Sequence, residues 1–117
     1  MTRASHAATA VASLLTEQAF MAQVTQLAEI RGWSWCHWRP ARTAHGWRTA
    51  GSGPLSKGFA DLTLVRTRDR RRIYAELKSS TGKLDADQRA VLDVLRHVAE
   101  VHVWRPQDWP AIEEVLR

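Results

Sequence analysis

The chain has 117 residues, of which 44% are hydrophobic and 25% are charged, and its formal net charge is +5. This length suits one domain with a single core, and the composition is that of an ordinary soluble globular protein. No apolar run approaches membrane-spanning length, so no membrane partner is expected. Cys36 is the single cysteine, which excludes a disulfide framework and a paired thiolate metal site and favours a cytoplasmic protein.

The first half of the chain predicts a helix, a strand and a loop. Residues 1–15 are alanine-rich and are expected to form a flexible extension, followed by one domain over residues 16–117. Thr16 is a suitable N-cap for a helix from about Glu17 to Arg31, with Gly32 as its stop. The expected buried face of this helix consists of Phe20, Val24, Leu27 and Ala28. A strand over residues 33–38 follows, and residues 39–58 are expected to form a long loop because glycine and proline recur there.

A β-hairpin comes next, with residues 59–65 and 72–78 as its strands and Arg68 near its turn. Period-two alternation puts Ile73, Ala75 and Leu77 on one face of the second strand, so Glu76 and Lys78 share the other face. Antiparallel pairing would bring Asp61 opposite Glu76 or one place off, and directly paired side chains lie about 4.5 to 5.5 Å apart at Cβ.

Two carboxylates that close repel each other unless a positive charge lies between them. A hard divalent cation such as Mg²⁺ prefers oxygen ligands and resolves this conflict. Asp61, Glu76 and Lys78 are therefore the minimum set for metal-assisted hydrolysis of a phosphodiester. The alternative is a solvated hairpin face with ordinary cross-strand ion pairs.

The rest of the chain predicts a helix, a strand and a second helix. Asp85 and Gln88 have capping-box spacing at the start of the first of these helices. Its expected buried residues are Val91, Leu92, Leu95 and Val98. A strand over residues 101–105 precedes a helix capped by Asp108, whose inward residues would be Ile112, Val115 and Leu116. The order α-β-β-β-α-β-α predicts an α/β fold with a mixed central sheet of about four strands flanked by helices.

Three segments together resemble the core of a known group of enzymes. Gly58-Phe-Ala-Asp61, Glu76-Leu-Lys78 and Gly82-Lys-Leu-Asp-Ala-Asp-Gln88 are similar to the motifs of the PD-(D/E)XK nuclease superfamily, and within it to the VRR-NUC type of small nuclease domain. The chain departs from the pattern at Ala60, where a proline is usual, and at Val103-Trp-Arg105, which matches only part of the valine-arginine motif.

The resemblance implies a restriction-endonuclease-like core and a role for each matching residue. Asp61, Glu76 and the Leu77 backbone carbonyl would ligate Mg²⁺, for which Mn²⁺ could substitute, and Glu17 would complete the site from the first helix. Lys78 would orient or help to deprotonate the attacking water, and Gln88 would support the site or touch the substrate. From the residues alone, Glu17 could instead favour the helix dipole, and Gln88 could be only a capping partner.

Arginine accounts for most of the 17 basic residues, which outnumber the 12 acidic ones. Because the guanidinium fork binds phosphate in a bidentate manner, nucleic acid is the leading partner class, although charge runs are also typical of solvated faces. We expect DNA contacts from Arg39, Arg42, Trp47, Arg48, Lys57, Arg68, Arg70, Arg71 and Lys83.

The six tryptophans could stack on unpaired bases, but most are expected to be structural. Trp33, Trp35 and Trp104 lie in predicted strands and would fill the core or a subunit interface, whereas Trp47 is the better candidate for contacting DNA. Two other kinds of site are not expected: a zinc site from His37, His45 and His102, and a serine nucleophile at Ser79 or Ser80.

The expected function is that of a metal-dependent DNA endonuclease. The family likeness suggests a branched substrate such as a four-way junction or a flap, in recombination, repair or phage DNA processing. Similarity to free-standing phage and bacterial members suggests a homodimer, which would also give a small domain enough surface for DNA. The alternatives are a nucleic-acid-binding module without catalysis and a sequence-specific enzyme of the restriction type.

Overall fold

The computed structural model describes residues 16–38, 40–43, 46–49 and 51–117, so the extension predicted for residues 1–15 lies outside it. The elements in chain order are α2 (Glu17–Ile30), β1 (Ser34–His37), β2 (Pro40–Thr43), β3 (Gly46–Thr49), β4 (Leu62–Arg66), the 3₁₀ turn η1 (Thr67–Asp69), β5 (Arg71–Leu77), α3 (Ala86–Arg96), β6 (Glu100–Trp104), the 3₁₀ turn η2 (Pro106–Asp108) and α4 (Trp109–Leu116).

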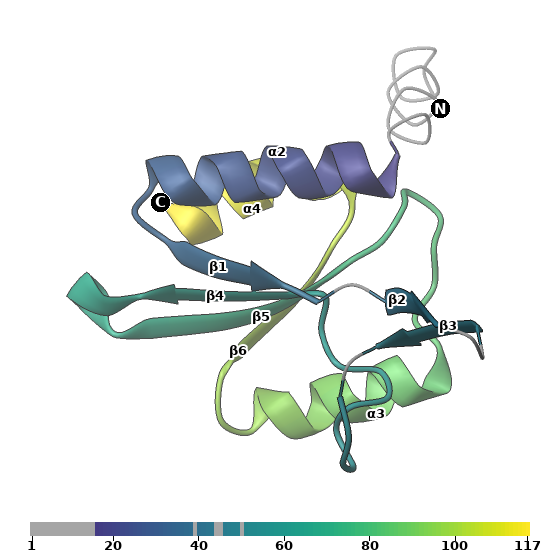
Figure 1. The fold of residues 1–117 in the computed structure, drawn as a ribbon. Helices are drawn as coiled ribbons and strands as arrows, with labels where there is room; N and C mark the ends of the chain where they lie inside the picture. The colour runs from purple at the N-terminus through teal and green to yellow at the C-terminus, as the bar shows by residue number, and fades with distance from the viewer. Residues whose placement is uncertain (1–15, 39, 44–45, 50) are drawn as a thin grey trace.

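The central sheet contains β1, β4, β5 and β6 in that spatial order. β1, β4 and β5 pair antiparallel, whereas β5 and β6 run parallel and are joined by α3 as a crossover. Figure 1 shows α2 and α4 on one side of this sheet and α3 on the other. The predicted α/β fold, a mixed sheet flanked by helices on both faces, is confirmed.

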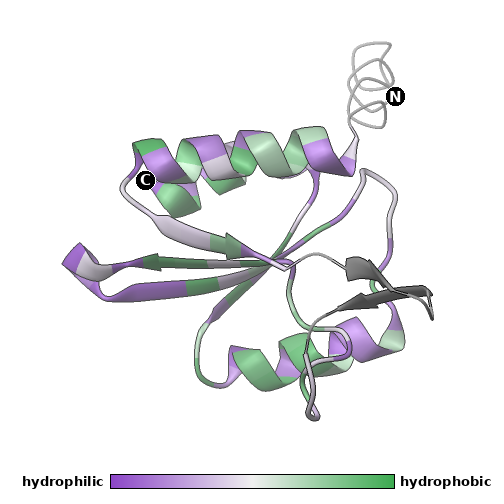
Figure 2. Cartoon of the chain, viewed as in Figure 1, coloured by the Kyte–Doolittle hydropathy of each residue, from purple (hydrophilic) through white to green (hydrophobic). Residues whose placement is uncertain are grey.

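Each face of the sheet has its own hydrophobic core. The larger core lies under α2 and α4, and its buried residues include Phe20, Val24, Ala28, Leu62, Leu64, Ile73, Ala75, Leu77, Ile112 and Leu116. The smaller core lies under α3 and contains Ala60, Val91, Leu92 and Leu95. Figure 2 shows hydrophilic and hydrophobic residues mixed along α2 and α3, as expected for helices that bury only one face.

Local signals fix the first helix much as its sequence predicts. The Thr16 hydroxyl accepts a hydrogen bond from the Ala19 backbone N–H at 3.0 Å and so caps the helix. Gly32 has a φ of +84°, the left-handed conformation that ends helices and that glycine adopts without steric cost. α2 therefore starts where expected and ends one residue earlier than expected, at Ile30.

The β4–β5 hairpin sets the register on which the candidate site depends. Leu62 pairs with Ala75 and Leu64 with Ile73, so these apolar side chains share the face toward α2. The turn is the 3₁₀ segment η1, closed by Arg70 in the left-handed conformation at a φ of +54°. One step beyond the Leu62–Ala75 pair, Asp61 falls beside Glu76, as the sequence predicted.

The segment predicted as a single loop over residues 39–58 contains a hairpin, so that prediction is wrong in part. β2 and β3 pair antiparallel through four residue pairs, from Pro40 with Thr49 to Thr43 with Gly46. Proline and glycine stand at strand ends here, where both are tolerated, and their presence concealed two strands that are too short to show clear periodicity.

Two smaller expectations are also wrong, and a third is narrowed. Val98 is exposed, because α3 ends at Arg96 and Val98 lies beyond it. The Asp108 carboxylate does not cap α4; it accepts a hydrogen bond from the Arg105 N–H at 2.8 Å and closes η2 instead. Trp33 and Trp104 are buried as expected, whereas Trp35 is 41% exposed, which excludes the core and leaves the subunit interface as its expected place.

Candidate active site

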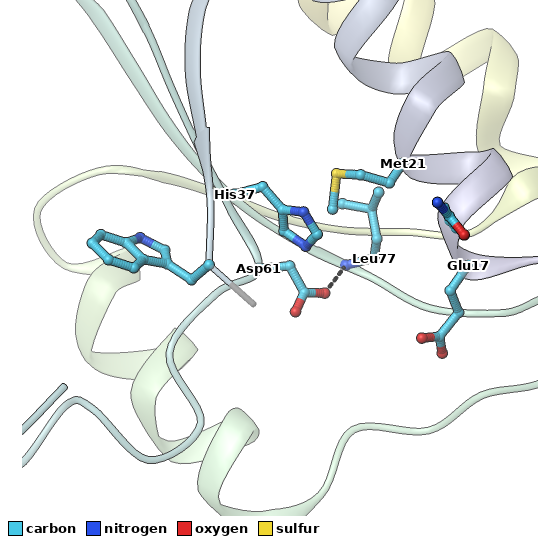
Figure 3. Close-up of a pocket in the computed structure, with 7 residues that line it drawn as sticks. Glu17, Met21, His37, Asp61 and Leu77 are labelled. Carbon is cyan, nitrogen blue, oxygen red and sulfur yellow. Dashed lines mark hydrogen bonds between the residues drawn. The ribbon is translucent and has the colours of Figure 1, made fainter. Parts of the chain in front are cut away.

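Asp61 and Glu76 contact each other at the start of β4 and near the end of β5. The Asp61 backbone N–H donates to Glu76 Oε2 at 3.3 Å, and the Leu77 N–H donates to Asp61 Oδ2 at 3.0 Å. Figure 3 shows the second of these bonds. Because Asp61 lies one residue before the paired part of β4, its carboxylate is free to turn across to β5 and accept this bond.

Glu76 is a buried carboxylate with polar neighbours. It is 1% exposed, the Gln88 side-chain amide donates to its Oε1 at 2.9 Å, and Lys78 Nζ lies 3.9 Å from the same oxygen. Burial raises the pKa of Glu76, the neighbouring Asp61 raises it in the same sense, and the charge of Lys78 opposes the shift, so that the pKa of Glu76 is about 8. Near neutral pH Glu76 therefore holds a proton, even with Lys78 beside it.

Gln88 has both of the roles that its position allowed. The Gln88 side-chain oxygen accepts a hydrogen bond from the Asp85 backbone N–H at 3.0 Å, and the Gln88 backbone N–H donates to Asp85 Oδ1 at 2.8 Å. These two bonds complete a capping box. The Gln88 amide nitrogen, left free by this arrangement, reaches Glu76. The start of α3 thus orients a carboxylate on β5.

Gly58 brings the segment before Asp61 against the same helix end. Its φ is +91°, and a Cβ at this position would lie 2.5 Å from the Asp87 carbonyl carbon and 2.6 Å from Gln88 N. Real Cβ atoms do not approach a backbone that closely, so the position requires glycine. The approach fixes residues 58–61 relative to Gln88 and hence to Glu76.

A pocket of about 420 Å³ opens beside Asp61. Its lining residues come from α2, β1 and the ends of β4 and β5: Glu17, Gln18, Met21, His37, Trp38, Asp61 and Leu77. In Figure 3, His37 and Asp61 lie on one side of the pocket and Glu17 on the other. Glu17 therefore lines the same pocket as Asp61, and its expected role as a further metal ligand stays a prediction.

The donor set fits a divalent cation, although the protein alone supplies few ligands. Within the described residues, no three His, Cys, Asp or Glu side chains gather closely enough to hold one ion. Asp61 and Glu76 nevertheless offer carboxylate oxygens at a place where two negative charges repel each other. Mg²⁺ is often bound by one or two carboxylates, with water and phosphate completing its shell, and such a shell suits this site.

His37 and Trp38 line the pocket, and the sequence did not point to either as a site residue. β1 pairs with β4 so that His37 lies opposite Leu62, one residue from Asp61. The Trp38 N–H also donates to the Asp61 carbonyl at 3.0 Å. This proximity arises from pairing across residues 39–58, and no local pattern in the sequence reveals it.

The residues predicted to contact DNA are distributed over both ends of the molecule. Arg39 lies outside the described residues, and Arg42, Trp47 and Arg48 are described by their backbone alone. Lys83 is exposed in the loop before α3. Lys57 forms an ion pair with Asp87, with 3.4 Å between Lys57 Nζ and Asp87 Oδ2. Figure 1 places the β2–β3 hairpin at the end of the molecule away from the β4–β5 turn.

Arg68 and Arg70 are exposed at the β4–β5 turn, but Arg71 has structural partners. The Arg71 guanidinium donates to both carboxylate oxygens of Glu100, at 2.9 and 2.8 Å, and to the Val115 carbonyl at 3.0 Å. This hydrogen-bonded pair lowers the pKa of Glu100. Arg71 is therefore occupied in holding α4 and β6 together.

The fold and the acidic pair define the class of protein: a nuclease of the PD-(D/E)XK superfamily, with a restriction-endonuclease-like core. The model of the VRR-NUC domain family matches residues 14–105, which is most of the chain, and the protein belongs to that family. No curated protein matched the chain. No solved structure matched it either.

Family membership fixes the coarse function. The domain is a nuclease, the superfamily generally uses divalent metal ions, and DNA is the substrate class that such a domain implies. α4 lies beyond the matched residues, yet Ile112 and Leu116 are fully buried in the larger core. In this chain the final helix is thus part of the domain's hydrophobic core.

Proposed function

We propose that the protein is a metal-dependent DNA endonuclease whose reaction centre is formed by Asp61, Glu76 and Lys78. The observation that carries the proposal is the contact between Asp61 and a buried Glu76 whose pKa is raised to about 8. Two carboxylates in contact with each other destabilise the fold, and a buried carboxyl with a raised pKa next to a pocket is typical of active sites. Within a nuclease family, binding of a catalytic cation is the function that suits it best.

Each residue has a role that agrees with its position. Asp61, Glu76 and the Leu77 carbonyl would hold Mg²⁺, or Mn²⁺ in its place. When bound, the ion would neutralise phosphate charge and lower the pKa of water. Gln88 holds Glu76 in place through its 2.9 Å hydrogen bond. The Lys78 ammonium, 3.9 Å from Glu76, can donate to the charge that develops on the phosphate and orient the attacking water.

Cleavage of labelled DNA tests this proposal against a module that binds without catalysis. Wild-type protein, Asp61→Ala and Lys78→Ala would be incubated with junction, flap, duplex and single-stranded DNA in Mg²⁺, Mn²⁺ or EDTA. We expect cleavage by the wild type only with metal, and a loss of at least about 100-fold in both variants. Equal binding by all three proteins with no cleavage by any would favour the non-catalytic module.

We further propose that the substrate is branched DNA, a four-way junction or a flap, and that the active form is a homodimer in the cytoplasm of a bacterium or a phage-infected bacterium. Two copies related by a two-fold axis would present two reaction centres to a symmetric junction. Sedimentation of the protein alone and with a junction tests the dimer. Cutting of ordinary duplex at one sequence motif would instead favour a restriction-type enzyme.

A further inference from the structure

Trp38 has different surroundings from Trp33, Trp35 and Trp104. Trp33 and Trp104 are each 3% exposed and belong to the core, and the Trp35 indole N–H donates to Glu29 Oε1 at 3.0 Å on the surface of α2. Trp38 is 46% exposed and lines the pocket beside Asp61. Exposure alone would be ordinary for a surface tryptophan, but Trp38 combines an exposed ring with a place in the lining of the pocket that contains Asp61.

The position of Trp38 is fixed relative to the reaction centre. Its backbone N–H donates to the Asp61 carbonyl at 3.0 Å, and the Asp61 carboxylate accepts from Leu77. Because Trp38 and Asp61 also line the same pocket, a group that stacks on the indole inside this pocket would lie beside the Asp61 carboxylate. The indole can position a substrate group at the phosphate that reacts.

The pocket itself suits a flat, neutral, heteroaromatic group. Met21 and Leu77, which are 8% and 6% exposed, supply apolar surface, and the His37 ring lies beside them (Figure 3). The Gln18 side chain offers an amide donor and an acceptor, the groups that pair with a base edge. Glu17 and Asp61 make the pocket acidic, and no Lys or Arg is among the described residues that line it, so a base fits better than a second phosphate.

We propose that Trp38 and this pocket form a binding site for one unstacked nucleobase next to the phosphate that is cut. The proposal rests on the proposed function, since the Asp61–Glu76 pair is what places the scissile phosphate nearby. Both faces of a base are covered in a duplex, so an indole can stack only on a base that is unpaired or flipped out. The site would make the enzyme select DNA with an unpaired nucleotide at the cut.

Fluorescence of 2-aminopurine tests the proposal by binding, without cleavage. The full-length protein would be titrated in Ca²⁺ into two DNAs that carry the probe at one position, unpaired at a branch in one and paired in a duplex in the other. We expect quenching of the unpaired probe. Base stacking on an aromatic side chain contributes about 1 to 3 kcal/mol, so Trp38→Ala should abolish quenching and weaken binding of the branched DNA roughly 5- to 150-fold.

Two further variants make the result specific. Trp38→Phe keeps an aromatic face and should retain most of the quenching, whereas Trp35→Ala removes an equally exposed tryptophan outside the pocket and should change neither signal. Trp38→Ala should bind fully paired duplex like the wild type. Unchanged quenching in Trp38→Ala, or equal weakening of branched and duplex DNA, would overturn the proposal.

Cleavage in Mg²⁺, measured separately, distinguishes this proposal from the proposed function. If the wild type cuts DNA and Trp38→Ala keeps the same preference for branched over duplex DNA, the proposed nuclease function stands and the proposed base-binding site is refuted. Loss of quenching in Trp38→Ala together with no cleavage by the wild type would support a base-binding site and refute the proposed metal-dependent cleavage. In an active enzyme, Trp38→Ala should raise KM for branched DNA more than it lowers kcat.

Discussion

At the scale of single residues, the decisive feature is a carboxylate that is destabilised by its surroundings. Glu76 is enclosed by the protein, and its nearest acidic group is Asp61. Its pKa is raised from 4.5 to about 8, so the folded state binds this proton more tightly than the unfolded state does. The contribution of protonated Glu76 to the free energy of unfolding is fully present below pH 4.5, and it is lost as the pH rises to about 8.

The first prediction concerns the stability of Glu76→Gln. Without metal, this variant should be more stable than the wild type at pH 8.5, by at least about 1 kcal/mol or about 4 °C in Tm, because no buried charge forms. Glutamine keeps a carbonyl oxygen for the Gln88 amide. Thermal unfolding in EDTA at pH 4.5 and 8.5 measures the effect, with Glu113→Gln as a matched exposed control. A wild type whose Tm difference from Glu76→Gln is the same at both pH values would contradict this account.

The second prediction concerns metal binding by the same residue. Glu76 must lose its proton before it can ligate a cation, so Mg²⁺ or Mn²⁺ affinity should rise about tenfold per pH unit up to pH 8 and then level off. Calorimetry in two buffers with different ionisation enthalpies measures both affinity and proton release. We expect close to one proton released at pH 7 and almost none at pH 9. Affinity that is constant over this range would show that Glu76 is not a ligand.

At the scale of elements, α3 is both a core helix and the support for the acidic pair. Its first turn provides the capping box between Asp85 and Gln88 and also the amide that holds Glu76. The sequence left these two roles as alternatives. In the structure they are compatible because the oxygen of one amide serves the cap while its nitrogen serves the carboxylate.

The third prediction separates these roles. Asp85→Ala and Gln88→Ala each remove part of the cap, so each should lower stability by about 1 kcal/mol. Only Gln88→Ala also releases Glu76, and loss of a residue that orients a metal ligand typically costs about 10- to 100-fold in activity. Unfolding and cleavage rates for both variants measure the two effects. Equal activity in the two variants would reduce Gln88 to a capping partner.

The fourth prediction concerns the contact between the segment before Asp61 and α3. Gly58→Ala would place a methyl group 2.5 Å from the Asp87 carbonyl carbon, so it should cost more than about 2 kcal/mol and move Asp61. Gly53 also has a positive φ, +101°, but nothing lies within 4 Å of its Cβ position. Gly53→Ala should therefore cost only the backbone strain, about 1 kcal/mol. Urea unfolding compares them, and similar losses would mean that the contact is unimportant.

How much the sequence could predict depended on whether the pairing was local. The Asp61–Glu76 register followed from alternation and a short turn, and α3 followed from a capping box. The positions of His37 and Trp38 could not be predicted, because they depend on β1 pairing with β4 across more than twenty residues. The short strands β2 and β3 were missed because a four-residue strand gives too few alternations to read.

At the scale of the whole molecule, the basic turn and the reaction centre lie at opposite ends of the β4–β5 hairpin. A strand rises about 3.3 Å per residue, so the turn is roughly 20 Å from Asp61. Figure 2 shows this turn as hydrophilic, and the sequence suggested that its arginines bind DNA. A duplex that reached both places would have to extend roughly six base pairs from the cut.

The arginines near the turn have different roles. Arg66 is 4% exposed and donates to Asp69 and to the carbonyls of Arg31, Leu116 and Arg117. Its guanidinium also lies 4.4 Å from the centre of the Trp33 ring. Arg66 thus joins the hairpin turn, the end of α2 and the end of α4. A charge run in the sequence cannot reveal this, because its carbonyl partners come from distant parts of the chain.

The last prediction separates folding arginines from DNA-binding ones. Arg68→Gln should leave Tm unchanged and reduce the slope of log K against log salt by about 1, because one phosphate contact is lost. Arg66→Gln should lower stability by about 3 to 5 kcal/mol, since it leaves Asp69 and several carbonyls without their partner, while the salt slope of the protein that remains folded stays the same. Thermal unfolding and DNA binding from 50 to 200 mM salt, conditions over which counterion release is large, measure both effects. A salt slope unchanged in Arg68→Gln would show that DNA does not reach the hairpin turn and would confine the contact surface to the end of the molecule that carries Asp61.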